Sequence, residues 1–301
     1  MPEREISGLA VRSLLLEASL APKPGLVTPY SNGSHRDMSF GTFVRSALAL
    51  SNCFTGCAGV GRALSARPPG EARVFLKEIG IKGEKNMYRA TGGVNTHKGA
   101  IYLLGFLCAA AGRLAGLRGN CTPRELARTG ASFVQGVVER ELALLASPSR
   151  LFTAGERAYM AYGLTGARGE VEEGYPLTLK ALDFLQARLP RASLKNALTD
   201  TFFFIVSRNG DTNLYARGGR DGLETAWSLA DGVLRAGGTG TREGWEKIRL
   251  TERVFVERNL SPGGSADILS CGVFLLSFAQ GPDSLPWRLK APSSATGGLL
   301  P

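Results

Sequence analysis

Apolar residues recur every three or four positions through most of the chain, a spacing typical of helices that bury one face. Proline and glycine interrupt this pattern and indicate where helices end. APKPG, at Ala21–Gly25, is one such stop, because neither proline can supply a backbone N–H. The pattern predicts a helix that begins near Gly99 and further helices over Ile6–Ser19, Ser39–Ala66, Glu71–Ile79, Pro123–Ala146, Leu151–Leu164, Leu177–Leu189, Leu194–Ser207, Gly222–Arg235, Glu243–Arg258 and Ala266–Phe278.

One helix start is marked by local sequence. Thr122 is a residue type that accepts a hydrogen bond from the first helical turn, and Pro123 lacks the N–H that would be unsatisfied there. Glu125 can reach back to the backbone N–H of Thr122. These three residues predict a capped helix start.

The alternative of β-structure is confined to one segment. TFFFIV, at Thr201–Val206, is rich in residues favoured in strands, yet a short apolar run fits a buried helix turn equally well. Strands do not alternate with helices along the chain, and no repeat of roughly 20–50 residues is visible. We therefore predict an all-α fold with one multi-helix domain over residues 1–280, followed by a poorly ordered tail over residues 281–301 that is rich in Pro, Ser and Gly.

Composition is that of a globular protein. The chain has 301 residues, of which 44% are hydrophobic, enough for a substantial core. Its five cysteines, an odd number without paired CxxC units, indicate a reducing compartment and no zinc site. The N-terminus lacks the features of a signal peptide, and the longest uncharged stretch, Gly99–Gly112, is shorter than the roughly 20 residues of a membrane span. We predict a cytoplasmic protein without a membrane segment.

The formal net charge of +10, from 36 basic and 26 acidic residues, favours an anionic partner. Nucleic acid is not the expected partner, because the basic residues are dispersed and no zinc-finger, RRM or KH signature occurs. A compact site for a phosphorylated small molecule remains open.

Five polar, glycine-containing segments interrupt the helical pattern. Glycine lets the backbone approach a ligand closely, and each segment adds cations, carboxylates or both. We predict that these glycine-rich interhelical loops meet at one end of a helical bundle and build the active site. The five polar segments are Pro22–Met38, Thr91–Ala100, Thr165–Pro176, Asn209–Gly219 and Asn259–Leu269.

Both histidines of the chain lie in these segments, each beside a cation: His35 next to Arg36 and His97 next to Lys98. A loop histidine either holds structure by hydrogen bonding or takes part in proton transfer. The segment TGGVNTHKGA, with Asn95 and Lys98, opens an apolar helix and suits a phosphate at the helix N-terminus. A tight turn with a capped helix explains the same residues equally well, and no P-loop pattern is present.

Carboxylates occur in four of the five polar segments. Together they can supply oxygen ligands for Mg²⁺ and a general base beside several cations, as a magnesium triphosphate requires. Each one alone is also explained by an ion pair at a helix end, Glu172 above all, or by a helix cap in the case of Asp267 beside Ser265. The carboxylates are Asp37, Glu170, Glu172, Glu173, Asp211 and Asp267.

The same segments resemble the triphosphoribosyl-dephospho-CoA synthase family, whose members serve citrate lyase and malonate decarboxylase. The motifs that carry the resemblance are PKPGLV, NGSHRDM, GGVNTHKGAIYLLG, RGEVEEGYP, DTNLYARGG and NLSPGGSADIL, in family order over about Glu17–Phe278. The resemblance implies an all-helical enzyme that converts ATP and 3′-dephospho-CoA into 2′-(5″-triphosphoribosyl)-3′-dephospho-CoA and adenine. It also implies that a separate nucleotidyltransferase attaches the product to an acyl carrier subunit, because the synthase motifs occupy the chain and leave no fused partner.

The implied chemistry suggests roles for the motif residues. Breaking an N-glycosidic bond develops oxocarbenium character that a carboxylate can stabilise, and another carboxylate can accept the proton of the 2′-hydroxyl. Mg²⁺ is expected to enter with ATP. The expected catalytic residues are Asp37, Glu170, Asp211, His35 and His97, with the histidines as donors to the leaving adenine. The expected metal ligands are Asp211, Glu170 and Glu173, and the expected phosphate-binding residues are Lys23, Arg36, Asn95, Lys98, Arg168 and Arg217.

Two other functions fit the same sequence. A related enzyme would transfer the ribosyl group to a different alcohol or hydrolyse the nucleotide. A non-catalytic nucleotide or RNA binder would account for the positive charge, and its nucleic-acid affinity would fall steeply with salt. Formation of adenine distinguishes this binder from the enzymes.

Overall fold

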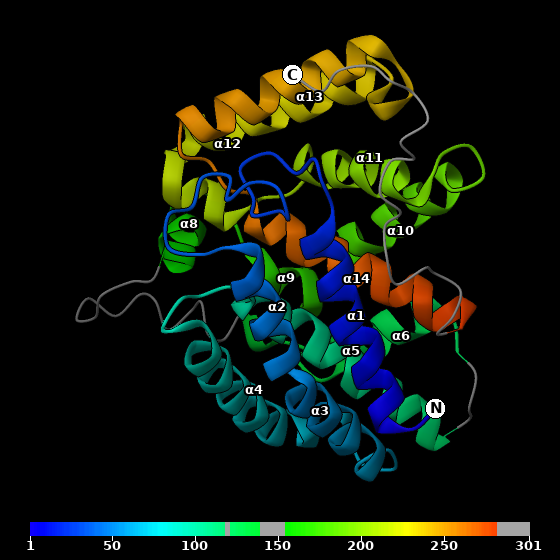
Figure 1. The fold of residues 1–301 in the computed structure, drawn as a ribbon. Coiled ribbons are helices and arrows are strands. Elements are labelled where there is room, and N and C mark those ends of the chain that lie inside the picture. The colour runs from blue at the N-terminus through cyan, green and yellow to red at the C-terminus, as the bar shows by residue number, and fades with distance from the viewer. Residues whose placement is uncertain (118–120, 139–153, 282–301) are drawn as a thin grey trace.

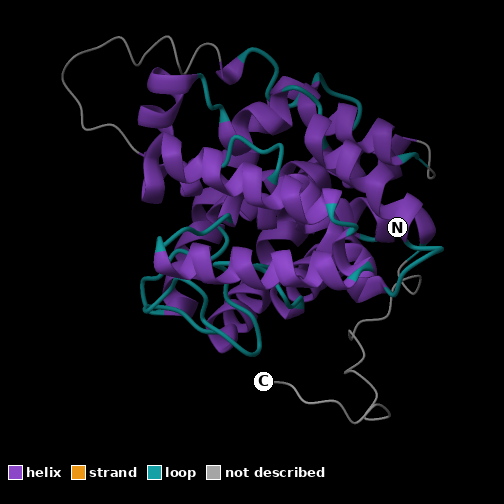
Figure 2. Ribbon diagram, turned by 90° about the horizontal axis from the view of Figure 1, so that it is seen from above, coloured by secondary structure: helices purple, strands orange, loops and turns teal. Residues whose placement is uncertain are grey.

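The computed structural model describes residues 1–117, 121–138 and 154–281. All regular elements in these ranges are helices and none is a strand (Figure 2), so the predicted all-α fold is confirmed. Apart from Gly281, the tail predicted over 281–301 lies outside the described residues. The elements are α1 (Glu3–Ser19), α2 (Phe40–Ala49), α3 (Ser51–Ala63), α4 (Pro69–Thr91), α5 (Lys98–Leu117), α6 (Pro123–Ser132), α8 (Ala154–Tyr162), α9 (Gly166–Glu172), α10 (Pro176–Arg188), α11 (Leu194–Val206), α12 (Thr212–Arg235), the 3-10 turn η2 (Gly238–Gly240), α13 (Arg242–Glu257) and α14 (Gly263–Gln280).

α5 and α14 lie at the centre of the molecule, and the other helices are arranged around them (Figure 1). α1 packs against α14 and α3 against α5, while α12 and α13 form an outer pair at the top of the view. By length and apolarity α5 resembles a membrane span, but 72% of its most apolar window is buried inside the protein. Packing in the core therefore accounts for its hydrophobicity.

Glycines allow α3 and α5 to touch along their backbones. A Cβ atom on Gly61 would overlap the carbonyl oxygen of Ala109, and one on Gly112 would overlap that of Ala58. A larger residue at either position would force the helices apart, because close-packed main-chain atoms cannot move aside. This crossing fixes α5, whose first residues belong to the polar segment Thr91–Ala100.

The single helix predicted over Ser39–Ala66 is wrong, because the chain forms two helices that meet at Leu50. Leu50 is fully buried, and its ψ of −8° tightens the turn and redirects the chain. Both helices pack against α1 and α4, but α3 packs chiefly against α5. The apolar period continues through Leu50 and does not reveal this change of packing partner.

α4 continues to Thr91 and is much longer than the predicted Glu71–Ile79. Gly83 lies inside the helix and does not end it. The glycine serves packing there, because its missing side chain lets Cys53 of α3 approach closely. The helix ends instead at Gly92, whose φ of +71° is a backbone conformation that suits glycine.

The predicted cap at Thr122 is confirmed. Thr122 and Glu125 exchange side-chain to backbone hydrogen bonds, and Pro123 occupies the first helical position. The helix ends at Ser132, well before the predicted end at Ala146. Residues 139–146 of the predicted helix lie outside the described part of the chain. TFFFIV is helical within α11, so the local alternative of a strand is wrong.

Four of the five polar segments are partly helical, in contrast to the predicted loops. They contain the start of α5, α9, the first two turns of α12 and the start of α14. Gly219, with a φ of +61°, interrupts α12 at the end of its segment. Each helix begins inside its segment, so N-termini with unpaired N–H groups are brought to the same region.

Candidate active site

Four contacts are enough to join all five polar segments. Three of these four are hydrogen bonds, and the fourth is a close approach in which a Cβ atom on Gly166 would lie 3.1 Å from Thr212 Cγ2. The long loop after α1 takes part and lies between α2 and the α12–α13 pair (Figure 1). The pairs are His35–Ser261, Asp211–Ser265, Ala100–Asp267 and Gly166–Thr212.

His35 is held as a neutral imidazole. The Arg217 guanidinium donates to Nδ1 at 3.1 Å, so the ring proton is on Nε2 and is donated to the Ser261 hydroxyl at 2.9 Å. Burial and the Arg217 charge lower the pKa of His35 to about 4, although the nearby Asp37 carboxylate opposes the shift. Both ring nitrogens therefore have protein partners at neutral pH.

Arg217 ties the first segment to the fifth. Its guanidinium donates to the carbonyl oxygen of Ser34 at 3.0 Å and to the side-chain oxygen of Asn259 at 2.9 Å. Burial lowers the pKa of Arg217, and the Asp37 charge opposes this. Together with the bond to His35, these contacts fix the loop that carries His35.

His97, which directly precedes α5, has one ring nitrogen without an acceptor. Thr96 donates its hydroxyl proton to Ser46 Oγ at 2.7 Å, and Ser46 Oγ lies 2.7 Å from His97 Nδ1. We assign Ser46 as the donor to Nδ1, and this assignment sets the ring tautomer. The ring proton is then on Nε2, which is buried and has no hydrogen-bond partner among the described residues. Burial and the charge of Lys23 lower the pKa of His97 to about 3, so the ring stays neutral.

Lys23, a predicted phosphate-binding residue, lies inside the protein. Its ammonium is paired with the Glu17 carboxylate, and the two side chains are 2% and 4% exposed. Burial lowers the pKa of Lys23, and the Glu17 charge opposes this. In this position Lys23 acts on neighbouring groups through its charge and does not present its ammonium to solvent.

Asp267 lies near Glu17, the partner of Lys23, and near the start of α5. Its carboxylate packs against Gly99, where a Cβ atom would overlap it, and accepts a hydrogen bond from the Ala100 N–H. Burial, followed by the charges of Glu17 and Asp211, raises the pKa of Asp267 well above its ordinary value. Among the described residues, no hydrogen bond from the α14 backbone to the Asp267 side chain is present, and the first N–H of this helix with a side-chain acceptor, that of Ser265, donates to Asp211. We call the group formed by Glu17, Lys23, His97 and Asp267 the buried cluster.

Asp211, a predicted catalytic residue and metal ligand, is engaged by two helix starts. Its Oδ1 accepts from the N–H groups of Asn213 and Leu214 in α12, at 2.9 and 3.3 Å. Its Oδ2 accepts from the N–H and the hydroxyl of Ser265 in α14, at 2.8 and 2.9 Å. Burial raises the pKa of Asp211. The carboxylate thus holds α12 and α14 together at their N-termini.

Glu170 has a similar place at the start of α10. Its carboxylate accepts from the N–H and the hydroxyl of Thr178, at 2.7 and 2.8 Å, and burial raises its pKa. Glu173 is exposed. Within the described ranges no three His, Cys, Asp or Glu side chains form a group that could hold a metal, so Asp211, Glu170 and Glu173 do not gather into one.

Other predicted residues lie at the surface of their segments. Arg36 and Asp37 are exposed on the loop after α1. The Asn95 side-chain oxygen accepts from the Lys98 N–H at 3.2 Å and so fixes the start of α5. The Lys98 ammonium lies 3.2 Å from the Glu84 carboxylate of α4, and 55% of its side chain is exposed.

A pocket of about 570 Å³ lies between α4, α5 and α9, and we call it the α4–α5 pocket. Lys98 and Arg168, cations of two different polar segments, both line it, as does Gly99. Arg73 and Lys77 of α4 add further positive charge. Its apolar wall includes Leu76, Ile81, Ile101, Phe106, Val134 and Val137.

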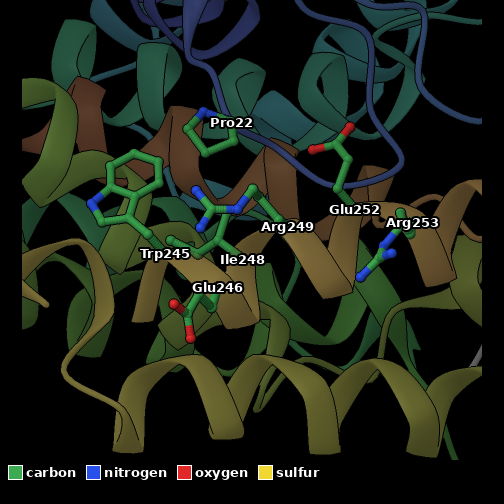
Figure 3. A pocket seen from close by; sticks show the side chains of 7 residues that line it. All are labelled: Pro22, Trp245, Glu246, Ile248, Arg249, Glu252 and Arg253. Atoms are coloured by element: carbon green, nitrogen blue, oxygen red, sulfur yellow. The ribbon is translucent and has the colours of Figure 1, made fainter. Parts of the chain in front are cut away.

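A second pocket, of about 660 Å³, lies between α13 and Pro22 of the loop after α1, and we call it the α13 pocket (Figure 3). Its charges are mixed, because Arg249 and Arg253 alternate with Glu246 and Glu252. Burial raises the pKa of Glu252. Among the residues that line this pocket, only Pro22 belongs to the five polar segments.

Sequence reasoning missed Glu17 and Ser46, which contact predicted site residues. Glu17 follows Leu14 by three positions and so falls on the buried face of α1, where a carboxylate is unusual. That position was the available signal. Ser46 carries no such mark, because a small polar residue is common within helices that bury one face.

Comparison with known proteins places the chain in a family. A family model described as CitG, ATP:dephospho-CoA triphosphoribosyl transferase, matches residues 3–284. A relative from Citrobacter koseri, named "Probable 2-(5''-triphosphoribosyl)-3'-dephosphocoenzyme-A synthase", is 42% identical over 274 residues, which is 90% of each chain. A crystal structure from Archaeoglobus fulgidus, named for a triphosphoribosyl-dephospho-CoA synthase, shares the fold with a TM-score of 0.51 at 18% identity, covering 80% of this chain and 99% of that one. The chain therefore belongs to the ATP:dephospho-CoA triphosphoribosyl transferase family, in agreement with the resemblance of its motifs.

Proposed function

We propose that this triphosphoribosyl-dephospho-CoA synthase acts by displacing adenine from ATP with the ribose 2′-hydroxyl of 3′-dephospho-CoA. The bond between C1′ of the ATP ribose and the adenine nitrogen breaks, and a bond from C1′ to the acceptor 2′-oxygen forms. The hydroxyl proton goes to a base, and the departing adenine takes up a proton from water. The triphosphate stays on the transferred ribose.

One observation carries the proposal: Lys98 and Arg168, from two motif-bearing segments, line one pocket together with Gly99. Cations of this kind bind phosphate oxygens, which both substrates carry. Asp267 lies directly behind Gly99, so a carboxyl group is close to the place where phosphates would bind.

We assign the base to Asp267. Burial raises the pKa of Asp267, so its carboxylate holds a proton more strongly than an ordinary aspartate does. Asp211 and Glu170 are less suited, because backbone N–H groups already occupy their carboxylates. In this proposal they hold helix starts in place.

We assign the hydrogen bond to the leaving adenine to His97. Its Nε2–H is a buried donor without an acceptor, and such a group costs free energy unless a ligand satisfies it. Because its pKa is about 3, His97 acts as a neutral donor. Arg36 and Asp37 are further candidates for contact with substrate, because they are exposed on the segment that carries His35.

We propose that Mg²⁺ enters as a complex with the ATP triphosphate, whose oxygens are its main ligands. The carboxylates of the described residues form no group suited to a resident metal.

The product is the precursor of a prosthetic group, and the motif resemblance supports its transfer to a separate nucleotidyltransferase in the cytoplasm. That enzyme would serve the acyl carrier subunit of citrate lyase or malonate decarboxylase.

The proposal is tested by incubating the purified protein with ATP, Mg²⁺ and 3′-dephospho-CoA. Adenine is measured by chromatography and the acceptor by mass spectrometry. We expect equal amounts of adenine and of dephospho-CoA that carries a triphosphoribosyl group. Adenine without this adduct would indicate hydrolysis or another acceptor, and folded protein that forms no adenine would indicate a binding protein.

A further inference from the structure

We propose that the α4–α5 pocket binds the pantetheine arm of the acceptor, with the acceptor diphosphate at Lys98 and Arg168. This inference rests on the proposed function, because it assigns one of the two substrates to one pocket. ATP and dephospho-CoA share an adenosine with phosphates. They differ in the long, uncharged arm that dephospho-CoA carries beyond its diphosphate, so a pocket for that arm distinguishes the acceptor from ATP.

The pocket has the length and direction that such an arm needs. The ion pair between Glu84 and Lys98 places one end of the lining beside the start of α5. From there the lining follows α4 back to Arg73. Arg73 and Glu84 are eleven residues apart in one helix, which corresponds to about 16 Å along its axis. An elongated groove suits a chain better than it suits a flat nucleobase.

Charge is distributed as the acceptor requires. Lys98 and Arg168 lie where α5 and α9 begin, next to the residues proposed for the chemistry. A diphosphate bound there leaves the ribose hydroxyl on the side of Asp267 and directs the arm along α4. Apart from Arg73 and Lys77, the stretch beyond is lined chiefly by apolar side chains, which can pack against the methyl and methylene groups of the arm.

Two apolar side chains of this lining are unusually exposed for their type. Val74 is 60% exposed and Ile81 is 45% exposed. They are seven residues apart in α4 and so lie on the same helix face. Covering this face would remove apolar surface from water, which is favourable at about 25 cal/mol per Å². A bound arm supplies that cover.

Gly80 offers a direct test, because it lines the pocket and has open space where a side chain would be. A Cβ atom on Gly80 would meet no heavy atom within 4 Å. The variant Gly80→Leu therefore fills the groove without a clash, and leucine is a better helix former than glycine. Gly70→Leu is the matched control, since Gly70 lies in the same helix with equally open space and does not line the pocket.

The first readout is steady-state kinetics with each substrate varied in turn. We expect Gly80→Leu to raise the KM for dephospho-CoA roughly tenfold or more, with the KM for ATP changed by less than about twofold. Gly70→Leu should behave as wild type for both substrates. If wild type makes the product and Gly80→Leu keeps the wild-type KM for dephospho-CoA, the pocket assignment is overturned while the proposed function stands.

The second readout does not need catalysis. Calorimetric titration with 4′-phosphopantetheine should show binding to wild type and to Gly70→Leu, and at least tenfold weaker binding to Gly80→Leu. This titration decides the assignment even if no product forms. Equal binding by all three proteins, or none, would contradict the assignment. A change of oligomeric state in Gly80→Leu by light scattering, with acceptor binding unchanged, would instead show that a second copy covers the pocket.

Discussion

The α5 start and the α12–α14 junction contain the same types of residue but use them differently. At the α12–α14 junction, made by His35, Asp211, Arg217 and Ser265, all four donors around Asp211 come from the protein and both ring nitrogens of His35 have partners. At the α5 start, made by His97, Lys98, Gly99 and Asp267, the Nε2–H of His97 has no acceptor in the described residues and a pocket adjoins. The comparison teaches that the polar groups of the α12–α14 junction hold the fold together, whereas the unsatisfied Nε2–H of His97 lies where substrate is expected.

The largest expected effect is on catalysis at the α5 start. In Asp267→Asn the amide oxygen can still accept from the Ala100 N–H, but the side chain can no longer accept a proton. We expect kcat for adenine release to fall by about 10²–10⁴. Unfolding in urea, as the control, should change by less than about 1 kcal/mol. A variant with wild-type kcat would remove Asp267 from the mechanism.

The next largest effect is on stability at the α12–α14 junction. Asp211→Asn replaces one acceptor oxygen by an NH₂ group that faces buried N–H donors. We expect the free energy of unfolding in urea to fall by about 3 kcal/mol, because buried donors lose their acceptor. The folded fraction should release adenine at a rate within a few-fold of wild type. An unchanged urea midpoint would show that Asp211 does not hold the two helices.

The histidines make stability depend on pH. Their pKa values in the folded protein, about 4 for His35 and about 3 for His97, lie below the ordinary 6.5. The unfolded chain therefore binds more protons below pH 6.5, and stability falls as the pH falls. Between pH 8 and 5 each histidine should remove about 2 kcal/mol.

This pH effect is isolated by comparing wild type with His35→Gln. Asp211, Asp267 and Glu170 have raised pKa values and oppose the trend in both proteins. Between pH 8 and 5 the variant should lose less stability than wild type, and the difference should be the contribution of His35, about 2 kcal/mol. Identical slopes in urea titrations at several pH values would mean that His35 is not buried as described.

The smallest effect concerns the ion pair at the mouth of the α4–α5 pocket. Glu84 competes with substrate phosphates for Lys98, but a largely exposed pair is worth only about 0–1 kcal/mol. Glu84→Gln should therefore lower the KM for dephospho-CoA by about two- to fivefold. A raised KM would show that Glu84 itself contacts the acceptor.

Sequence predicted the helical class and most helix positions, because apolar period and capping residues act locally. Thr122 and Glu125 are an example, since their hydrogen bonds depend only on each other. The break at Leu50 was missed because it depends on the packing of α3 against α5, a helix distant in sequence. The extension of α4 past Gly80 was missed because the glycine that follows, Gly83, packs against α3.

The sequence predicted which segments form the candidate site, but it predicted less well what each residue in those segments does. Asp211 precedes Thr-Asn-Leu at a helix start, and this capping signal was present in the sequence. The burial of Lys23 beside Glu17 and the contact of Asp267 with Gly99 depend on chain segments brought together by the fold. No local pattern encodes such contacts, so only the structure assigns them.

The most direct test of the central claim compares Asp267→Asn with Asp211→Asn in one assay. Adenine release at saturating ATP and 3′-dephospho-CoA is measured for both and divided by the folded fraction from circular dichroism. The account predicts that Asp267→Asn is folded and nearly inactive, while the folded part of Asp211→Asn is active. An active Asp267→Asn together with a folded but inactive Asp211→Asn would place the chemistry at the α12–α14 junction and contradict the account.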